Sequence, residues 1–121
     1  MNPNQGKAKV RLRPMRLADL DQVLAIEKAS FPTPWPVQAF LYEIHRKKNS
    51  ICWVAEITNT KGNAIIAGTI VIWLVGAEAH IGTLSVHPGY RRQGVAHYLL
   101  VQGLLECRRK GIMAAFLEVR E

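Results

Sequence analysis

The segment from His80 to Gly111 constrains the fold of this chain more than any other stretch. It begins with a run of apolar β-forming residues that ends at a His-Pro-Gly turn; the run contains Ile81, Leu84 and Val86. Apolar residues then recur at helical spacing, at Val95, Leu99, Leu100, Leu104 and Leu105. Basic residues at 108–110 suit the negative end of a helix dipole, and a glycine follows as the usual C-terminal stop. The segment therefore predicts a strand, a tight turn and an amphipathic helix.

The residues that open this helix favour the binding of an anion. A helix start exposes N–H groups that have no partner inside the helix, and their partial positive charge attracts anions. Gly94 would let phosphate oxygens approach the backbone closely, while Arg91 and Arg92 add positive charge nearby. Residues 91–96 therefore predict a binding site for a pyrophosphate. The alternative is a solvated basic turn before an ordinary surface helix.

This segment resembles the acetyl-CoA-binding motif of the GNAT superfamily of N-acetyltransferases. The motif is Arg or Gln, two variable residues, Gly, one variable residue, then Gly or Ala, and Arg91, Gly94 and Ala96 fill its defined places. An apolar strand before the motif, and an amphipathic helix and a β-like AAFLEVR after it, make the match more specific than the motif alone. Within the superfamily the chain most resembles the ribosomal-protein alanine N-acetyltransferases, through Ser30-Phe31-Pro32, Trp35 and Leu117-Glu118-Val119-Arg120.

The resemblance implies an α+β architecture, the three-layer α/β/α acyl-CoA N-acyltransferase (GNAT) fold with a mixed sheet. The helix and two strands that close the family's sheet find no counterpart here, so we expect a C-terminally truncated version of the enzyme. Its last strand would then be an unpaired apolar edge, which favours a homodimer or a strand swap with a partner chain. A single domain is expected over residues 7–121, after a disordered tail at 1–6.

The resemblance also implies a cosubstrate, an acceptor and a set of site residues. Acetyl-CoA would donate the acetyl group to the N-terminal α-amine of a protein, for instance a ribosomal protein. The pantetheine arm is expected along Leu84, Ser85 and Val86, where the Val86 N–H would polarise the thioester carbonyl. The pyrophosphate is expected at Arg91, Arg92, Gln93, Gly94, Val95, Ala96 and His97. The family's leaving-group tyrosine lies beyond the end of this sequence.

Glu118 matches the general base of the family. It is the only acidic residue in the otherwise apolar stretch Ile112–Val119, so partial burial and a raised pKa are expected. The alternative is a glutamate at a strand end that points to solvent. An inactive remnant that binds CoA without turnover also remains open at this stage.

Two helices are expected before the central strands. Asp19 is a candidate N-cap for the first, which carries Leu20, Val23, Leu24 and Glu27 at helical spacing. Val37, Phe40, Leu41 and Ile44 mark the second. The loop between them holds three prolines, which stiffen it. In the resembled family this loop lies over the acceptor, so Phe31 and Trp35 are expected to wall that site; the alternative is that they cover the core edge.

Further strands are predicted on both sides of these helices. Residues 7–16 alternate basic and apolar side chains, which indicates a half-buried strand with a basic outer face or, alternatively, a basic arm for RNA. Residues 51–57, 64–75 and 112–119 are the other strands, the last parallel to the central one. A hairpin turn is expected at Asn59–Asn63. Gly68 predicts a bulge or a close approach by another element.

Charge and composition narrow the range of possible partners, compartments and metal sites. The formal net charge of +7 favours anionic partners, and a basic RNA- or ribosome-binding module using residues 7–16 and Lys47-Lys48 is the alternative function. The two cysteines, without a signal peptide, indicate the cytoplasm. The longest apolar run is broken by glycines and is shorter than the roughly 20 residues of a membrane-spanning helix. The four histidines lack metal-ligand spacing, so no metal site is expected.

Overall fold

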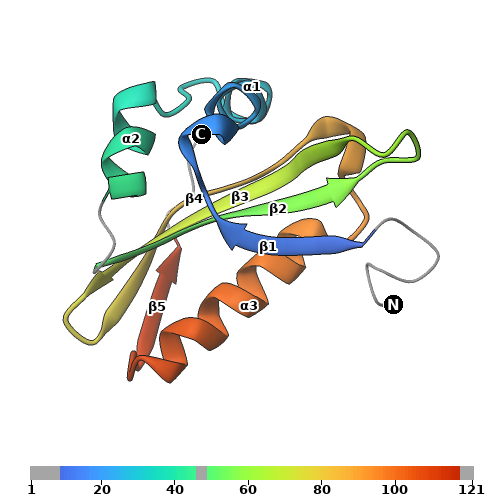
Figure 1. Cartoon of the computed structure of the whole chain (residues 1–121). Coiled ribbons are helices and arrows are strands. Elements are labelled where there is room, and N and C mark those ends of the chain that lie inside the picture. The colour runs from blue at the N-terminus through green and yellow to red at the C-terminus, as the bar shows by residue number, and fades with distance from the viewer. Residues whose placement is uncertain (1–8, 46–48, 118–121) are drawn as a thin grey trace.

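The computed structural model describes residues 9–45 and 49–117, and within them the chain forms one five-stranded sheet in the order β1-β2-β3-β4-β5 (Figure 1). The strands are β1 (Val10–Pro14), β2 (Ser50–Thr58), β3 (Ala64–Val75), β4 (Glu78–Val86) and β5 (Ala114–Leu117). The first four are antiparallel neighbours, whereas β5 pairs parallel with β4. The mixed sheet and its parallel last strand are therefore as predicted.

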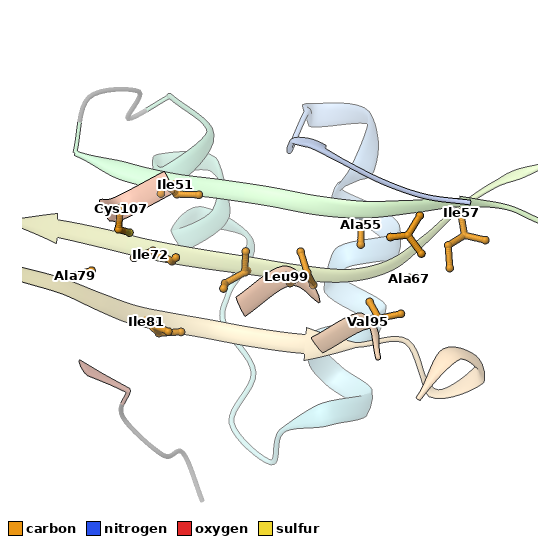
Figure 2. Packing of buried hydrophobic residues seen from close by; sticks show 12 residues of the cluster. Ile51, Ala55, Ile57, Ala67, Ile72, Ala79, Ile81, Val95, Leu99 and Cys107 are labelled. Atoms are coloured by element: carbon orange, nitrogen blue, oxygen red, sulfur yellow. The ribbon is translucent and has the colours of Figure 1, made fainter. Parts of the chain in front are cut away.

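Helices cover both faces of the sheet (Figure 1). They are α1 (Leu20–Ser30), α2 (Val37–His45) and α3 (Val95–Arg109). One buried cluster joins α3 to the sheet through residues such as Leu99 and Ile72 (Figure 2). A second cluster, which includes Val23 and Phe40, fills the space between the sheet and the pair α1 and α2. The three-layer α/β/α arrangement is thus confirmed.

The buried face of α3 differs in part from the predicted stripe. Val95 and Leu99 are buried as expected, and the stripe continues through Gly103 and Cys107. Leu105 is 45% exposed, so its expected place in the core was wrong. Because Gly103 has no side chain, the helix can approach β3 closely. A Cβ at this position would lie 2.8 Å from Ile72 Cδ1. Burial at every fourth residue follows the helical period, but a glycine within it carries no hydrophobic signal.

Gly68 permits a second close approach, between β3, β4 and α3. A Cβ at this position would lie 2.9 Å from the backbone oxygen of Ser85 and 3.0 Å from Leu99 Cδ1. The register of β3 against β2 also shifts beside Gly68, where Ala55 pairs with Gly68 and Glu56 pairs with Ile66. Both the bulge and the close approach expected there are confirmed.

Gly68→Ala should destabilise the protein because its methyl group meets rigid backbone. We expect a loss of about 1–3 kcal/mol in the free energy of unfolding, typical of overpacking. Gly103→Ala is the matched control, since its methyl would meet only the flexible side-chain ends of Ile72 at 2.8 Å and Ile70 at 3.6 Å, and a gain in helix propensity of about 1 kcal/mol offsets that contact. Urea unfolding of both variants measures the difference. Equal stability of the two variants would contradict the packing at Gly68.

Arg13 forms a buried ion-pair cluster at the edge of the sheet. Its guanidinium donates to both carboxylate oxygens of Asp19 at 2.8 Å and to Glu56 Oε2 at 2.9 Å. Asp19 stands at the N-cap position of α1, but its side chain accepts from the Arg16 N–H instead of capping that helix. The predicted side-chain cap was therefore wrong. Arg13 also does not contribute to the basic outer face expected for this strand, because its charge is paired with two carboxylates.

This cluster predicts a specific dependence of stability on pH. Burial alone would raise the pKa of Asp19, but hydrogen bonds from Arg13 and from the Arg16 N–H outweigh it and lower that pKa. A carboxyl group whose pKa is lower in the folded state contributes stability above its unfolded pKa of about 3.9, and that contribution is lost as pH falls through the folded value. We expect Asp19→Asn to be less stable than the parent protein at pH 7, with the difference shrinking below about pH 4. Urea unfolding at both pH values measures this, with the exposed Asp21→Asn as control.

The outer edge of β5 carries apolar side chains at the surface. Phe116 is 46% and Leu117 59% exposed, and Met113 just before the strand is 85% exposed. Within residues 9–45 and 49–117 no strand pairs with β5 on this side. The apolar edge expected from the sequence is present in this part of the chain, whereas the homodimer or strand swap stays a prediction.

Several sequence-based predictions fall outside the described residues. They concern the tail at 1–6, the lysines at 47–48 and the segment 118–121 with Glu118. The remaining predicted elements agree with the structure within a few residues. In the hairpin turn between β2 and β3, Asn59 Oδ1 accepts from the N–H groups of Lys61 and Asn63, which explains why asparagine begins it.

Candidate active site

The site is organised around the end of β4, beyond the point where β5 pairs with it. The parallel pairing runs from Glu78 opposite Ala114 to Ile81 opposite Leu117. Within the described residues, Gly82–Val86 has no partner on this side, and Thr83–Val86 pairs only with β3. Leu84 and Val86 turn toward the α3 face, and Ser85 is buried. Among the described residues, the predicted pantetheine segment therefore has one backbone edge without a strand partner.

A tight turn carries the chain from this strand to the start of α3. The short 3-10 helix η2 (Pro88–Tyr90) is capped by His87, whose Nδ1 accepts from the Gly89 N–H at 2.8 Å. Arg92 then has φ 62° and Gly94 φ 83°. A left-handed conformation is uncommon for a side chain as large as arginine, and such positions often accompany binding sites.

The N-terminus of α3 is open to a ligand. Gly94 occupies its N-cap, and no side chain of the described residues caps this helix end. The first intrahelical bond runs from the Tyr98 N–H to the Gly94 carbonyl at 2.9 Å. The N–H groups of the first turn lie before this bond, so they can bind an anion. The structure thus brings the predicted residues 92–97 into one turn.

Arg91, the first residue of the motif, makes two hydrogen bonds within the protein. Its Nε donates to the Val86 carbonyl, and its Nη2 donates to Ser30 Oγ, both at 3.2 Å. Ser30 lies at the end of α1 and donates to the Ile26 carbonyl at 2.7 Å. Arg91 therefore connects the end of β4 to the end of α1.

The loop between α1 and α2 lies against β4 through Trp35. Trp35 stacks on Trp73 of β3 with ring centroids 5.5 Å apart and an interplanar angle of 14°. A Cβ on Gly82 would lie 3.0 Å from both indoles, so glycine is required beneath them. Trp35 and Trp73 also line a groove of about 600 Å³, together with Pro36, Gln38, Ala39, Tyr42 and Glu43.

The two aromatic residues predicted to wall the acceptor site, Phe31 and Trp35, differ in their relation to this groove. Trp35 lines the groove, whereas Phe31 does not; the Phe31 N–H instead ends α1 by donating to the Glu27 carbonyl at 3.0 Å. The sequence analysis missed Trp73, which a strict alternation along β3 would place on the face opposite Ile72. It also missed Glu43, whose Oε2 accepts from the indole Nε1 of Trp73 at 2.6 Å.

A second overlooked carboxylate is Glu27, which is fully buried at the centre of the site. Its Oε2 accepts from Thr83 Oγ1 at 2.8 Å and from Ser85 Oγ at 3.3 Å. Its Oε1 accepts from the Trp35 N–H at 3.2 Å. Glutamate on the apolar face of a predicted helix was the available signal, since charged residues are rarely buried without partners.

Both cysteines are free thiols with raised pKa values. Burial, with the negative charges of Glu43 and Asp19, raises the pKa of Cys52 to about 12. Burial also raises the pKa of Cys107, and Glu106 adds to this. A thiol that holds its proton is a poor nucleophile, so neither residue is suited to covalent catalysis.

We therefore expect both thiols to react slowly with a disulfide reagent such as dithionitrobenzoate in the native protein. The rate near pH 8 should be more than about tenfold below that of the same protein in denaturant. Stopped-flow absorbance measures both rates. Fast labelling of the native protein would show that the two sites open readily. The same experiment measures how much the protein's own thiols add to the signal of an assay that detects released CoA thiol.

Two further searches of the described residues concern metals and membranes. In this part of the chain no three His, Cys, Asp or Glu side chains gather in a group that could hold a metal ion. No helix in the ranges 9–45 and 49–117 is both long and apolar enough to cross a membrane.

Comparison with known proteins places this site in a family. The acetyltransferase (GNAT) family matches residues 20–121, and the chain belongs to that family. It is 32% identical over 114 residues to a Bacillus subtilis protein provisionally named ribosomal protein bS18-alanine N-acetyltransferase, covering 94% of this chain and 72% of the relative.

Two solved structures show the same fold. The ribosomal-protein-S18-alanine N-acetyltransferase from Escherichia coli aligns with a TM-score of 0.76 at 23% identity, over 93% of this chain and 68% of that one. The PaiA N-acetyltransferase from Thermoplasma acidophilum, solved in complex with coenzyme A, aligns with a TM-score of 0.73 at 17% identity. That alignment covers 92% of this chain and 79% of the other. The chain thus has the GNAT fold and is an acetyltransferase by family.

Proposed function

We propose that the protein transfers the acetyl group of acetyl-CoA to the N-terminal α-amine of a protein, such as a ribosomal protein. One observation carries the proposal: the open N-terminus of α3 at Gly94 lies directly after the strand edge at Leu84–Val86. The first would bind a diphosphate through backbone N–H groups, and the second would bind an extended amide-containing arm. Coenzyme A carries both groups in one molecule.

Main-chain groups would make most of the coenzyme contacts. The N–H groups of residues 92–97 would hold the pyrophosphate, and backbone groups of Leu84, Ser85 and Val86 the pantetheine arm. Binding of coenzyme A is supported by the Thermoplasma acidophilum protein, which has the same fold and was solved in complex with coenzyme A. Arg91 would contribute through its link between β4 and α1, and Arg92 through its positive charge.

The reaction forms a bond between the amine nitrogen and the acetyl carbon and breaks the carbon–sulfur bond. The amine loses a proton to a base, and the CoA thiolate takes up a proton as it leaves. Bound acetyl-CoA would supply the electrophile, while the Val86 N–H would stabilise the charge that develops on its carbonyl oxygen. We assign the base to Glu118, which follows β5 directly in the sequence.

An N-terminal amine suits this chemistry better than a lysine. Its pKa is about 7.7–8.0, against about 10.4 for lysine, so much more of it is neutral near pH 7.5. The names of the relatives from Bacillus subtilis and Escherichia coli refer to the alanine of a small-subunit ribosomal protein. The groove beside Trp35 and Trp73 would receive the acceptor segment.

Two further parts of the proposal concern the compartment and the assembly. Two free thiols, Cys107 buried and Cys52 partly buried, suit a reducing compartment such as the cytoplasm. The apolar outer edge of β5 would be covered by a second copy of the chain or by a swapped strand, and size-exclusion chromatography with light scattering tests this.

A thermal shift and a peptide assay together test the proposed function. Acetyl-CoA should raise the melting temperature, and a peptide with a free N-terminal alanine should release CoA thiol, whereas its N-acetylated form should not. Thermal protection without turnover would support the alternative of an inactive CoA-binding remnant. RNA binding that falls steeply with salt, without acetyl-CoA binding, would favour the basic binding module; the ion pairs of Arg13 weaken that alternative.

A further inference from the structure

Glu27 joins three parts of the site that are far apart in the sequence. It lies on α1, its Oε1 accepts from the N–H of Trp35 in the following loop, and its Oε2 accepts from hydroxyl groups of β4. The two hydroxyl donors, Thr83 and Ser85, lie beyond the pairing of β4 with β5 that the described residues form. One buried side chain therefore fixes both the loop over the groove and the strand beside it.

Packing alone does not explain a glutamate at this position. Burying a charged or polar group without partners is costly, and an apolar side chain of similar size would fill the space at least as well. Oxygens that accept hydrogen bonds from both the loop and the strand set the distance between them. The Arg91 link from β4 to Ser30 holds the same end of α1 from the other side.

We infer that Glu27 is a positioning residue, which holds the loop of Trp35 against β4 so that acceptor and coenzyme keep a fixed alignment. The inference rests on the proposed function, because it assigns the residue a part in that reaction. Small errors in alignment slow a reaction between two bound groups strongly, so such a residue acts on turnover without touching either substrate.

Hydrogen exchange in the absence of any ligand tests the tether itself. Glu27→Ala should speed amide exchange at Phe31, Thr33 and Trp35, the non-proline residues of this loop, since it removes the acceptor for the Trp35 N–H. Glu27→Gln should give an intermediate rate, because its oxygen can still accept from Trp35 while its NH₂ donates to the hydroxyl oxygens. Glu56→Gln, which alters the distant pair with Arg13, should leave this loop unchanged. Unchanged exchange in Glu27→Ala would overturn the inference.

Kinetics at a temperature where every variant is folded tests the part in the reaction. Glu27→Gln should lower kcat/KM for the peptide by about 10- to 100-fold, while the Kd for acetyl-CoA from calorimetry stays near the parent value. A purely structural role would lower the melting temperature but leave kcat/KM per folded molecule unchanged, and that result would also overturn the inference. If the parent protein binds no acetyl-CoA, the proposed function fails separately, and the exchange experiment still decides whether Glu27 tethers the loop.

Discussion

Gly94→Glu should abolish the thermal protection that acetyl-CoA gives to this protein. Ligand at 100 times its Kd stabilises a folded protein by about 2.7 kcal/mol, which is a clear rise in melting temperature. Gly94 precedes the first turn of α3, where the N–H groups would hold the diphosphate. A carboxylate at this position would repel the diphosphate and occupy its place. We expect the affinity for acetyl-CoA to fall by more than about 100-fold, a loss of about 2.8 kcal/mol.

The matched control is Gly62→Glu in the turn between β2 and β3. Gly62 and Gly94 both have φ 83°, so glutamate at either position meets the same backbone strain. A Cβ on Gly62 would meet no atom within 4 Å, and the turn lies in a separate part of the chain. We expect Gly62→Glu to lower the melting temperature yet keep the full shift with acetyl-CoA.

A third variant separates charge from shape. Gly94→Asn tolerates the left-handed backbone and adds no charge, so it should keep part of the protection. Thermal shifts at a series of acetyl-CoA concentrations give the three affinities. Equal protection of Gly94→Glu and the parent protein would exclude the start of α3 as the diphosphate site.

The elements that the sequence predicted well are those with a strong local pattern. Apolar β-forming residues and a turn signal located the central strand from His80 to Val86, which the structure extends back to Glu78, and helical spacing located α3 almost to the residue. The coenzyme segment was accessible for the same reason, since a glycine before an amphipathic helix is a local feature. The hairpin at Asn59–Asn63 is another case, because its hydrogen bonds form within the turn.

The parts that the sequence did not predict depend on contacts between separate elements of the fold. Glu27 was assigned only to a helix, because its donors Thr83 and Ser85 lie more than fifty residues away. Asp19 was expected to cap α1, but its carboxylate accepts hydrogen bonds from Arg13 of β1 instead. Neither outcome can be deduced from local propensity. The Glu27 contacts depend on how α1 packs against β4, and the Arg13–Asp19 pair, although only six residues apart in the sequence, depends on how β1 leads into α1.

Glu118→Gln should reduce the rate of acetyl transfer strongly and leave coenzyme binding intact. A general base contributes about 10²- to 10⁴-fold, so kcat should fall by that range while acetyl-CoA protects the variant as it does the parent. The described pairing of β5 with β4 ends at Leu117 opposite Ile81. Glu118 is the next residue in the sequence.

The pH dependence distinguishes a base from a residue that only binds. In the parent protein the rate should rise with pH as the base loses its proton and again as the amine does, whereas Glu118→Gln should keep only the rise near the amine pKa of about 7.7–8.0. Glu106→Gln, the same change on α3 away from β4, should behave like the parent protein. An unchanged kcat in Glu118→Gln would mean that the glutamate lies at a strand end in solvent. The amine would then have to lose its proton to water or to another group, and the role of general base could not be assigned to Glu118 from its resemblance to the family.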